Sequence, residues 1–286
     1  MTWLQGLGDL LGNGQATNAL TIGTIAALLS AALGYFVVLR GLSFAGHAVT
    51  DVGLAGGAGA VLVGLSPLWG LLAFCALAAV GVDLLGKRAR ERDVATGVIL
   101  SLALGIGSLF LYVSTRFANE TSALLFGSIF AADPALTPAL LLISLACLAI
   151  LAAIYRPLLL CSINPETAAA RGVPVRLVGL VFIVVMAVGV AEASQVVGVL
   201  LSTALLIGPA ASAAYLATRP AAVIAITAAL GALETWAGIT LAYDTSWPVS
   251  FFITALALSV YLLARALHPI ARRRTAPPRQ PHEALT

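Results

Sequence analysis

Charged residues are scarce in this chain. Lys, Arg, Asp and Glu make up 9% of the 286 residues, whereas hydrophobic residues make up 60%. Soluble domains contain about 25% charged residues, so a water-soluble fold of this length would lack the polar surface that it needs. The composition therefore excludes a soluble protein and predicts an all-α, polytopic bundle of membrane helices.

Several other features are missing as well. The three cysteines, Cys75, Cys147 and Cys161, are scattered and imply no disulfide framework. The segment at residues 1–18 lacks the basic residues that open a cleavable signal peptide. The sequence GVDLLGKR at residues 81–88 resembles a phosphate-binding loop, but no Ser or Thr follows the lysine and no strand precedes it. We therefore expect no nucleotide site, no catalysis and no cofactor in this chain.

Apolar runs bounded by charged residues, proline or glycine predict about nine spanning helices. A span needs roughly 20 mostly apolar residues. The predicted spans are 18–39, 43–65, 67–86, 94–114, 134–155, 176–193, 195–217, 220–242 and 247–267. Residues 1–268 are thus expected to form one transmembrane domain, and the Pro-rich, charged segment 269–286 a disordered cytoplasmic tail.

The basic residues alternate between the two ends of the predicted spans. Of the 15 Lys and Arg residues, all except Arg116 follow an odd-numbered span. Because cytoplasmic loops carry an excess of Lys and Arg, this pattern predicts an N-terminus outside and a C-terminus in the cytoplasm. It explains the net charge of +3 without nucleic acid and predicts a multi-pass protein of the plasma membrane.

Small residues are abundant, with 27 Gly in the chain. In a membrane, small residues permit helices to approach closely. The run GLAGGAGA at residues 53–60 therefore predicts tight packing of the second span against a neighbour rather than a ligand site.

Ionisable residues inside spans mark candidate sites, because each costs about 2.5–3.5 kcal/mol at a helix centre. His47 and Asp51 are four residues apart in the second span, so their Cβ atoms are expected about 5–6 Å apart on one face. An imidazole and a carboxylate suit a divalent transition metal. Proton handling, or a hydrogen bond that only holds helices together, are the alternatives. Glu234 and Glu192 are weaker candidates.

Gly208 and Pro209 lie inside the seventh predicted span. A proline in a helix removes a hydrogen bond and tends to kink or break it, and broken helices often line transport pathways. A plain kink accommodated by neighbouring helices is the alternative.

The loop between the fifth and sixth spans has the features of a capped helix at about residues 164–173. An asparagine suited to the N-cap precedes a proline and a first-turn glutamate, and a glycine and a proline end the helix. An unstructured loop needs no such caps, so we expect a cytoplasmic helix that docks onto another protein. The residues of this prediction are Asn164, Pro165, Glu166, Ala170 and Gly172.

Six stretches occur in order along the chain: RGLSFAGHAVTDVGLAGGA, RERDVATGVILSLALGIG, LLFGSIFAADP, NPETAAARGVPV, VVGVLLSTALLIGPAASAA and GITLAYDTSWPVS. Together they resemble the permease subunits of ABC importers for zinc, manganese or iron, which are fed by metal-binding lipoproteins. The resemblance covers about residues 40–263. In that family the second-span motif reads Gly-Asp-Ala-x-Ser-His-Ala-x-Leu-Pro-Gly. His47 stands here at the family's Asp position and Asp51 at its His position, so the two ligand types are exchanged at the same spacing.

The resemblance implies that His47 and Asp51 contact the metal as it passes. It implies that the helix from about Glu166 to Gly172 fits a groove on a separate ATPase subunit. It further implies a permease homodimer on an ATPase dimer, with an extracellular metal-binding protein that delivers the ion. We therefore predict a permease subunit of an ATP-driven importer for zinc, manganese or iron, with a slight preference for zinc.

Three alternatives stay open. An ABC permease for iron chelates or cobalamin would not need the His–Asp pair. A secondary transporter that uses protons through His47, Asp51 and Glu234 would not need the capped helix. A membrane scaffold would have no transport activity.

Overall fold

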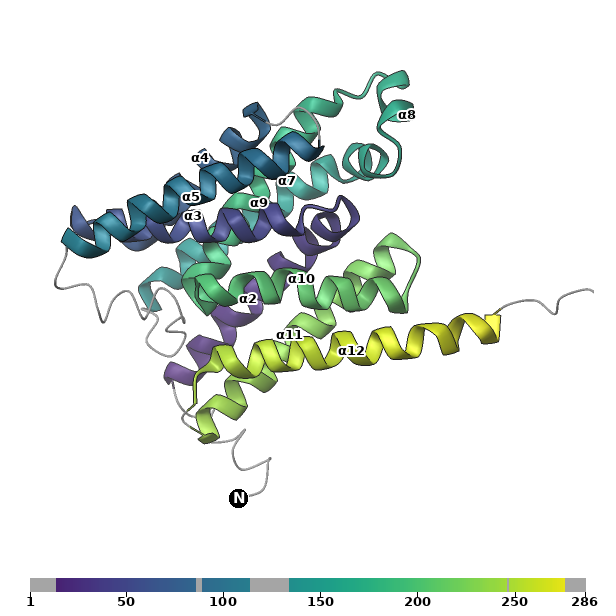
Figure 1. Cartoon of the computed structure of the whole chain (residues 1–286). Coiled ribbons are helices and arrows are strands. Elements are labelled where there is room, and N and C mark those ends of the chain that lie inside the picture. The colour runs from purple at the N-terminus through teal and green to yellow at the C-terminus, as the bar shows by residue number, and fades with distance from the viewer. Residues whose placement is uncertain (1–13, 86–88, 114–133, 246, 276–286) are drawn as a thin grey trace, which may run out of the picture.

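The computed structural model describes residues 14–85, 89–113, 134–245 and 247–275, and helices dominate it (Figure 1). No strand occurs in these ranges, which confirms the all-α class. Each of the nine predicted spans overlaps one long helix. These are α2 (Gly14–Leu39), α3 (Ser43–Leu62), α4 (Pro67–Leu85), α5 (Ala89–Val113), α7 (Thr137–Ile163), α9 (Val175–Val197), α10 (Val199–Leu216), α11 (Pro220–Thr245) and α12 (Val249–Thr275).

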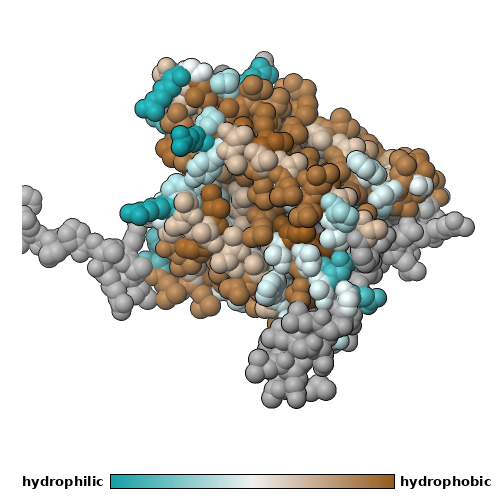
Figure 2. Space-filling model, turned by 180° about the vertical axis from the view of Figure 1, so that it is seen from behind, coloured by the Kyte–Doolittle hydropathy of each residue, from teal (hydrophilic) through white to brown (hydrophobic). Residues whose placement is uncertain are grey.

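The helices belong to a multi-pass membrane protein. In the part of the chain that the structure describes, six helices are long and apolar enough to cross a membrane, namely those within α2, α5, α7, α9, α11 and α12. Apolar helices at Pro67–Val82 and Ser202–Leu216 are shorter. Figure 2 shows apolar side chains over most of one face and hydrophilic ones near its margins. The count of nine spans and the orientation of the termini stay predictions.

Two predicted ends lie eight residues too early. Helix α12 continues to Thr275, although the sequence predicts a span that ends at residue 267 and a disordered tail from residue 269. Helix α7 continues to Ile163, although the sequence predicts an end at residue 155 because of the Arg156–Pro157 pair. The last turns of α7 bury Leu158 and Cys161 in the main core. This burial maintains the helix beyond a proline that the sequence reads as a terminator.

Helix α2 occupies the centre of the bundle. It packs against α7, α9, α10 and α11, while α3 packs against α4, α5, α9 and α10. Leu33 and Phe36 of α2 are fully buried, and the Phe36 ring packs edge-on against Phe182 of α9. In Figure 1, α3, α4 and α5 lie together on one side of α2, and α10, α11 and α12 lie on the other. Helices α9 and α10 connect the two groups, because α9 packs against α3 and α4 and α10 packs against α3.

The glycine-rich run of α3 packs tightly against α4. A Cβ atom at Gly56 would overlap the carbonyl oxygen of Gly70, and a Cβ atom at Gly70 would overlap the carbonyl oxygen of Gly56. The two backbones therefore touch, which confirms the predicted role of this run in packing.

We expect Gly56→Ala to lower the free energy of unfolding by about 1–3 kcal/mol, because the added methyl group forces α3 and α4 apart. Thermal unfolding of the purified chain in detergent measures the effect. Gly97→Ala on α5 is the matched control, since a Cβ atom there meets nothing within 4 Å. Equal unfolding temperatures for both variants would contradict the packing argument.

Candidate functional site

The His47–Asp51 pair lies near the beginning of α3. His47 Nε2 is 3.6 Å from Asp51 Oδ2, and the two side chains are 46% and 19% exposed. The pair is therefore accessible from the surface of the single chain and is not enclosed by its core. Thr50, between them in sequence, is buried and donates its hydroxyl to the Gly46 carbonyl oxygen at 2.9 Å. The imidazole and the carboxylate are thus the two groups that α3 offers to a ligand here.

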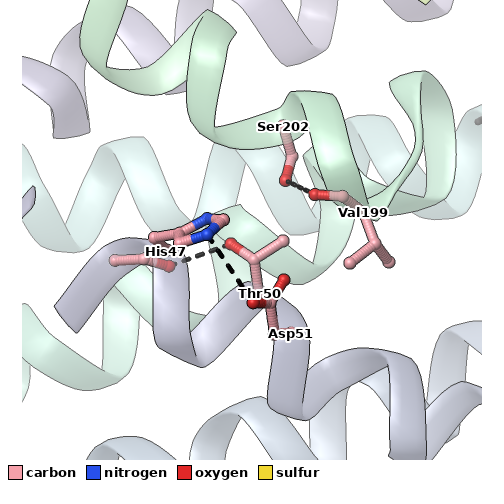
Figure 3. A network of polar contacts seen from close by, with 6 residues as sticks. His47, Thr50, Asp51, Val199 and Ser202 are labelled. Atoms are coloured by element: carbon pink, nitrogen blue, oxygen red, sulfur yellow. Dashed lines mark hydrogen bonds and ion pairs between the residues drawn. The ribbon is translucent and has the colours of Figure 1, made fainter. Parts of the chain in front are cut away.

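The beginning of α10 lies beside this pair. Figure 3 shows Val199 and Ser202 of α10 next to His47, Thr50 and Asp51, and α3 and α10 pack together. The Ser202 hydroxyl is 3.1 Å from the Val199 carbonyl oxygen and 3.1 Å from the Ser194 hydroxyl of α9. The polar surroundings of the pair therefore include the junction between α9 and α10.

This junction is a helix break at Gly198. Helix α9 ends at Val197, α10 begins at Val199, and Gly198 has a φ of 98°. Only glycine adopts such a backbone conformation readily. The sequence predicts a break between spans 176–193 and 195–217, four residues before the observed one, and a single glycine in the apolar run marks its position. Reasoning from the sequence missed Ser194 and Ser202, which are separated by eight residues and meet only because the chain turns between them.

A break at Gly208–Pro209, one of the two outcomes considered from the sequence, does not occur. Helix α10 runs unbroken from Val199 to Leu216 with Pro209 inside it. Helix α12 packs closely against α10 at this point, since a Cβ atom at Gly208 would lie 3.0 Å from the Cβ atom of Ala257 on α12. The Ser212 hydroxyl also donates to the Gly208 carbonyl oxygen at 2.8 Å. Helix α10 therefore continues through the proline while it packs against α12, which is the accommodated kink considered from the sequence.

The two glutamates lie inside the bundle. Glu192 on α9 is fully buried, and its Oε1 accepts a hydrogen bond of 2.6 Å from the Ser144 hydroxyl of α7. Glu234 on α11 is 3% exposed, and neither carboxylate oxygen has a partner among the described residues. Within the ranges that the structure describes, no three His, Cys, Asp or Glu side chains gather to hold a metal. The structure therefore does not bring Glu192 or Glu234 together with the His47–Asp51 pair.

A short helix, α8 (Pro165–Ala170), lies in the loop for which the sequence predicts one. The Asn164 side chain accepts a hydrogen bond of 2.9 Å from the Thr167 backbone N–H, as an N-cap does. At the other end Gly172 has a φ of 77°, and the Val173 N–H donates to the Ala168 carbonyl oxygen at 3.0 Å. These are the features of a Schellman C-cap.

Most residues of helix α8 are exposed. Ala168 is fully buried, whereas Pro165, Glu166, Ala169, Ala170 and Arg171 are exposed. Figure 1 shows α8 at one end of the bundle, beyond the long helices. The capping interactions fix the shape of an exposed, protruding element, which is what a docking helix requires.

Comparisons with known proteins agree with this arrangement. Residues 15–268 match the model of the ABC 3 transport family. Manganese transport system membrane protein MntC of Halalkalibacterium halodurans is 27% identical over 253 residues, covering 87% of each chain. Manganese import system permease protein ScaB of Streptococcus pneumoniae is 29% identical, covering 90% of this chain and 91% of that one. The solved structure of PsaBC from Streptococcus pneumoniae in complex with Fab superposes with a TM-score of 0.83 at 26% identity, covering 92% of this chain and 95% of that one.

Proposed function

We propose that this chain, which belongs to the ABC 3 transport family, is the membrane-spanning permease of an ATP-driven importer for a divalent transition metal. The observation that carries the proposal is the half-exposed His47–Asp51 pair on a helix within a membrane bundle. Ionisable residues at such positions are costly, and they mark pathways for ions or substrates. Manganese is the favoured cargo, because the relatives described above are named for manganese transport.

A second copy of the chain completes the metal path. The pair supplies one nitrogen and one carboxylate ligand, fewer than the four to six that a transition metal takes. A two-fold axis beside α3 would place the same two side chains of another copy opposite them. The exposure of the pair supports this arrangement, since burial at such an interface removes a polar surface that lipid would otherwise meet. The metal then passes between two permease subunits.

The ligand chemistry suits a transient site. Carboxylate and imidazole groups bind manganese and zinc without the thiolates that would favour zinc strongly. The three cysteines of the chain are buried elsewhere in the bundle. Conduction requires that an ion bind well enough to enter and weakly enough to leave. A path of nitrogen and oxygen ligands meets both requirements.

Energy comes from a separate ATPase subunit that binds α8. A partner is needed because the chain has no nucleotide motif, and α8 is exposed and rigidly capped. Residues 171–174 connect α8 to α9, and α9 ends at the Gly198 break beside the His47–Asp51 pair. Movement of α8 in response to ATP therefore reaches the pathway through α9. An extracellular metal-binding protein supplies the ion on the other side.

Uptake measurements distinguish this proposal from a proton-coupled transporter. We expect cells that express the chain with its partner subunits to accumulate radiolabelled manganese, with uptake that stops when ATP is depleted. A protonophore applied at constant ATP should leave the initial rate unchanged. Uptake that persists without ATP and collapses with the protonophore would favour secondary transport instead.

Competition by other cargoes completes this experiment. Excess unlabelled zinc or iron salts report how the path discriminates between metals. An iron chelate or cobalamin that is itself taken up, with no uptake of free manganese, would favour the sister class of ABC permeases for large substrates.

A further inference from the structure

The carboxyl group of Glu192 on α9 is buried and contacts α7. Glu192 is 0% exposed and Ser144 of α7 is 3% exposed. The Ser144 hydroxyl donates to Glu192 Oε1 at 2.6 Å, and Glu192 Oε2 has no partner among the described residues. One oxygen of this carboxyl group is therefore satisfied, and the other lacks a donor.

A second polar atom lacks a donor on the same face of α9. Gln195 lies one turn after Glu192, and its buried Oε1 also has no hydrogen-bond partner among the described residues. Both atoms are acceptors, and buried acceptors are normally paired. A single proton on Glu192 Oε2 converts that oxygen into a donor, and the neighbouring Gln195 Oε1 is the acceptor that it needs.

The positive charges of the described elements around Glu192 lie far from it. Arg40, which follows α2, lies over the Phe182 ring of α9, ten residues before Glu192 and thus about 15 Å along the helix. Helix α2 has no charged residue between Gly14 and Leu39, and α10 has none between Val199 and Leu216. The basic residues Arg156 of α7 and Arg176 of α9 are about 18 Å from Ser144 and 24 Å from Glu192 along their helices, at 1.5 Å per residue. An ionised Glu192 would therefore be an unpaired charge in a dry contact, which proteins avoid.

Few other titratable side chains lie on the helices packed against α9. Cys147 of α7, one turn from Ser144, is a buried free thiol. Cys75 of α4 donates to the Val49 carbonyl oxygen of α3. His47 and Asp51 of α3 bind each other at the surface. The other titratable groups on these helices include Tyr35 of α2, Tyr155 and Cys161 of α7, and Tyr215 of α10, and a phenol or a thiol supplies no positive charge.

We propose that Glu192 is a proton-binding site, in which Oε1 accepts from Ser144 and the protonated Oε2 donates to Gln195 Oε1. Glu192 lies six residues before the Gly198 break, about 9 Å along α9. The proton stays bound while α7 and α9 remain packed and dry. Any movement of α9 that admits water to this contact lets the proton leave. The site thereby links protonation to the conformation of the helix that joins α8 to the break.

Infrared spectroscopy of the full chain in lipid nanodiscs tests the proposal directly. Glu192→Gln preserves both hydrogen bonds, since the amide oxygen accepts from Ser144 and the amide nitrogen donates to Gln195. We expect the wild-type minus Glu192→Gln difference spectrum to show the loss of one protonated carboxylic acid band. Glu91→Gln, at an exposed position of α5, is the matched control and should remove only a carboxylate band.

The other outcomes are equally informative. Ser144→Ala should keep the acid band and shift it to higher frequency, because the carbonyl oxygen loses its donor. Loss of a carboxylate band in a folded Glu192→Gln variant would overturn the proposal and indicate a bound water or cation instead. Loss of the acid band when manganese is added to the wild type would also overturn it and make Glu192 a metal ligand. These measurements do not depend on transport, so they are independent of the proposed function.

A pH series provides the second readout. Raising the pH removes the proton and leaves a buried charge, so the unfolding temperature of the wild-type chain should fall as pH rises. Glu192→Gln removes the titrating group and should flatten this part of the curve. Wild-type and variant curves of the same shape would count against the site.

Discussion

Alanine at His47 or at Asp51 is expected to abolish metal uptake while the chain stays folded. Each copy of the chain offers two ligands at this point of the path, so either substitution removes half of the set. Loss of groups that only support a metal ligand already costs 10–100-fold in affinity or activity. We therefore expect uptake to fall by about 100-fold or more. The folded state should survive, because both side chains are partly exposed and bind each other rather than the core.

Metal uptake by cells, together with size-exclusion chromatography of the purified variants, checks this prediction. Thr50→Ala is the matched control, because its hydroxyl is used by the helix backbone and not by a ligand. Normal uptake by both His47→Ala and Asp51→Ala would remove the basis of the metal assignment.

A double exchange sharpens the test. His47→Asp combined with Asp51→His keeps one imidazole and one carboxylate at the same spacing and restores the order of the family motif. We expect this variant to transport metal at a rate far above that of either single alanine variant. Failure of the double variant, with the fold intact, would mean that the order of the two ligands matters as well as their presence.

Distortion of α8 is expected to weaken binding of the ATPase subunit and to abolish the hydrolysis that the permease stimulates. Gly172 ends α8 at a φ of 77°, where a residue with a side chain is disfavoured by roughly 1–2 kcal/mol. Gly172→Val should therefore disturb the C-cap and the exposed surface that α8 presents. Glu166→Arg should disturb the same surface by reversing a charge in the first turn. We expect each variant to co-purify with the ATPase about tenfold less and to lose stimulated hydrolysis.

Gly64→Val is the matched control for backbone strain. Gly64 has a φ of 75°, and a Cβ atom there meets nothing within 4 Å. It lies between α3 and α4, whereas α8 packs against α7 and α9. Its substitution imposes a similar strain without touching the proposed contact, so ATPase binding should be normal. Equal binding by the Gly172→Val, Glu166→Arg and Gly64→Val variants would exclude α8 as the docking element.

Features that depend on local sequence were predictable. The scarcity of charge and the length of the apolar runs gave the helical class and the approximate position of each long helix. The α8 caps follow from Asn164 and Gly172, because capping hydrogen bonds join residues only a few positions apart. The spacing of His47 and Asp51 likewise places them on one face of α3, since i and i+4 side chains are neighbours on any α-helix.

Features that depend on contacts between distant segments required the tertiary structure. The sequence allows α10 either to break or to kink at Pro209, and in the structure, where α10 packs against α11 and α12, it stays whole. The pairing of Glu192 with Ser144 spans 48 residues, and no local pattern indicates it. Exposure of the His47–Asp51 pair is likewise decided by which helices leave that face of α3 uncovered. The sequence by itself determined which helices form and which side chains they carry, because helix formation and capping are local. The tertiary structure decided which of those side chains are buried, paired or open to a partner, because burial depends on every helix at once.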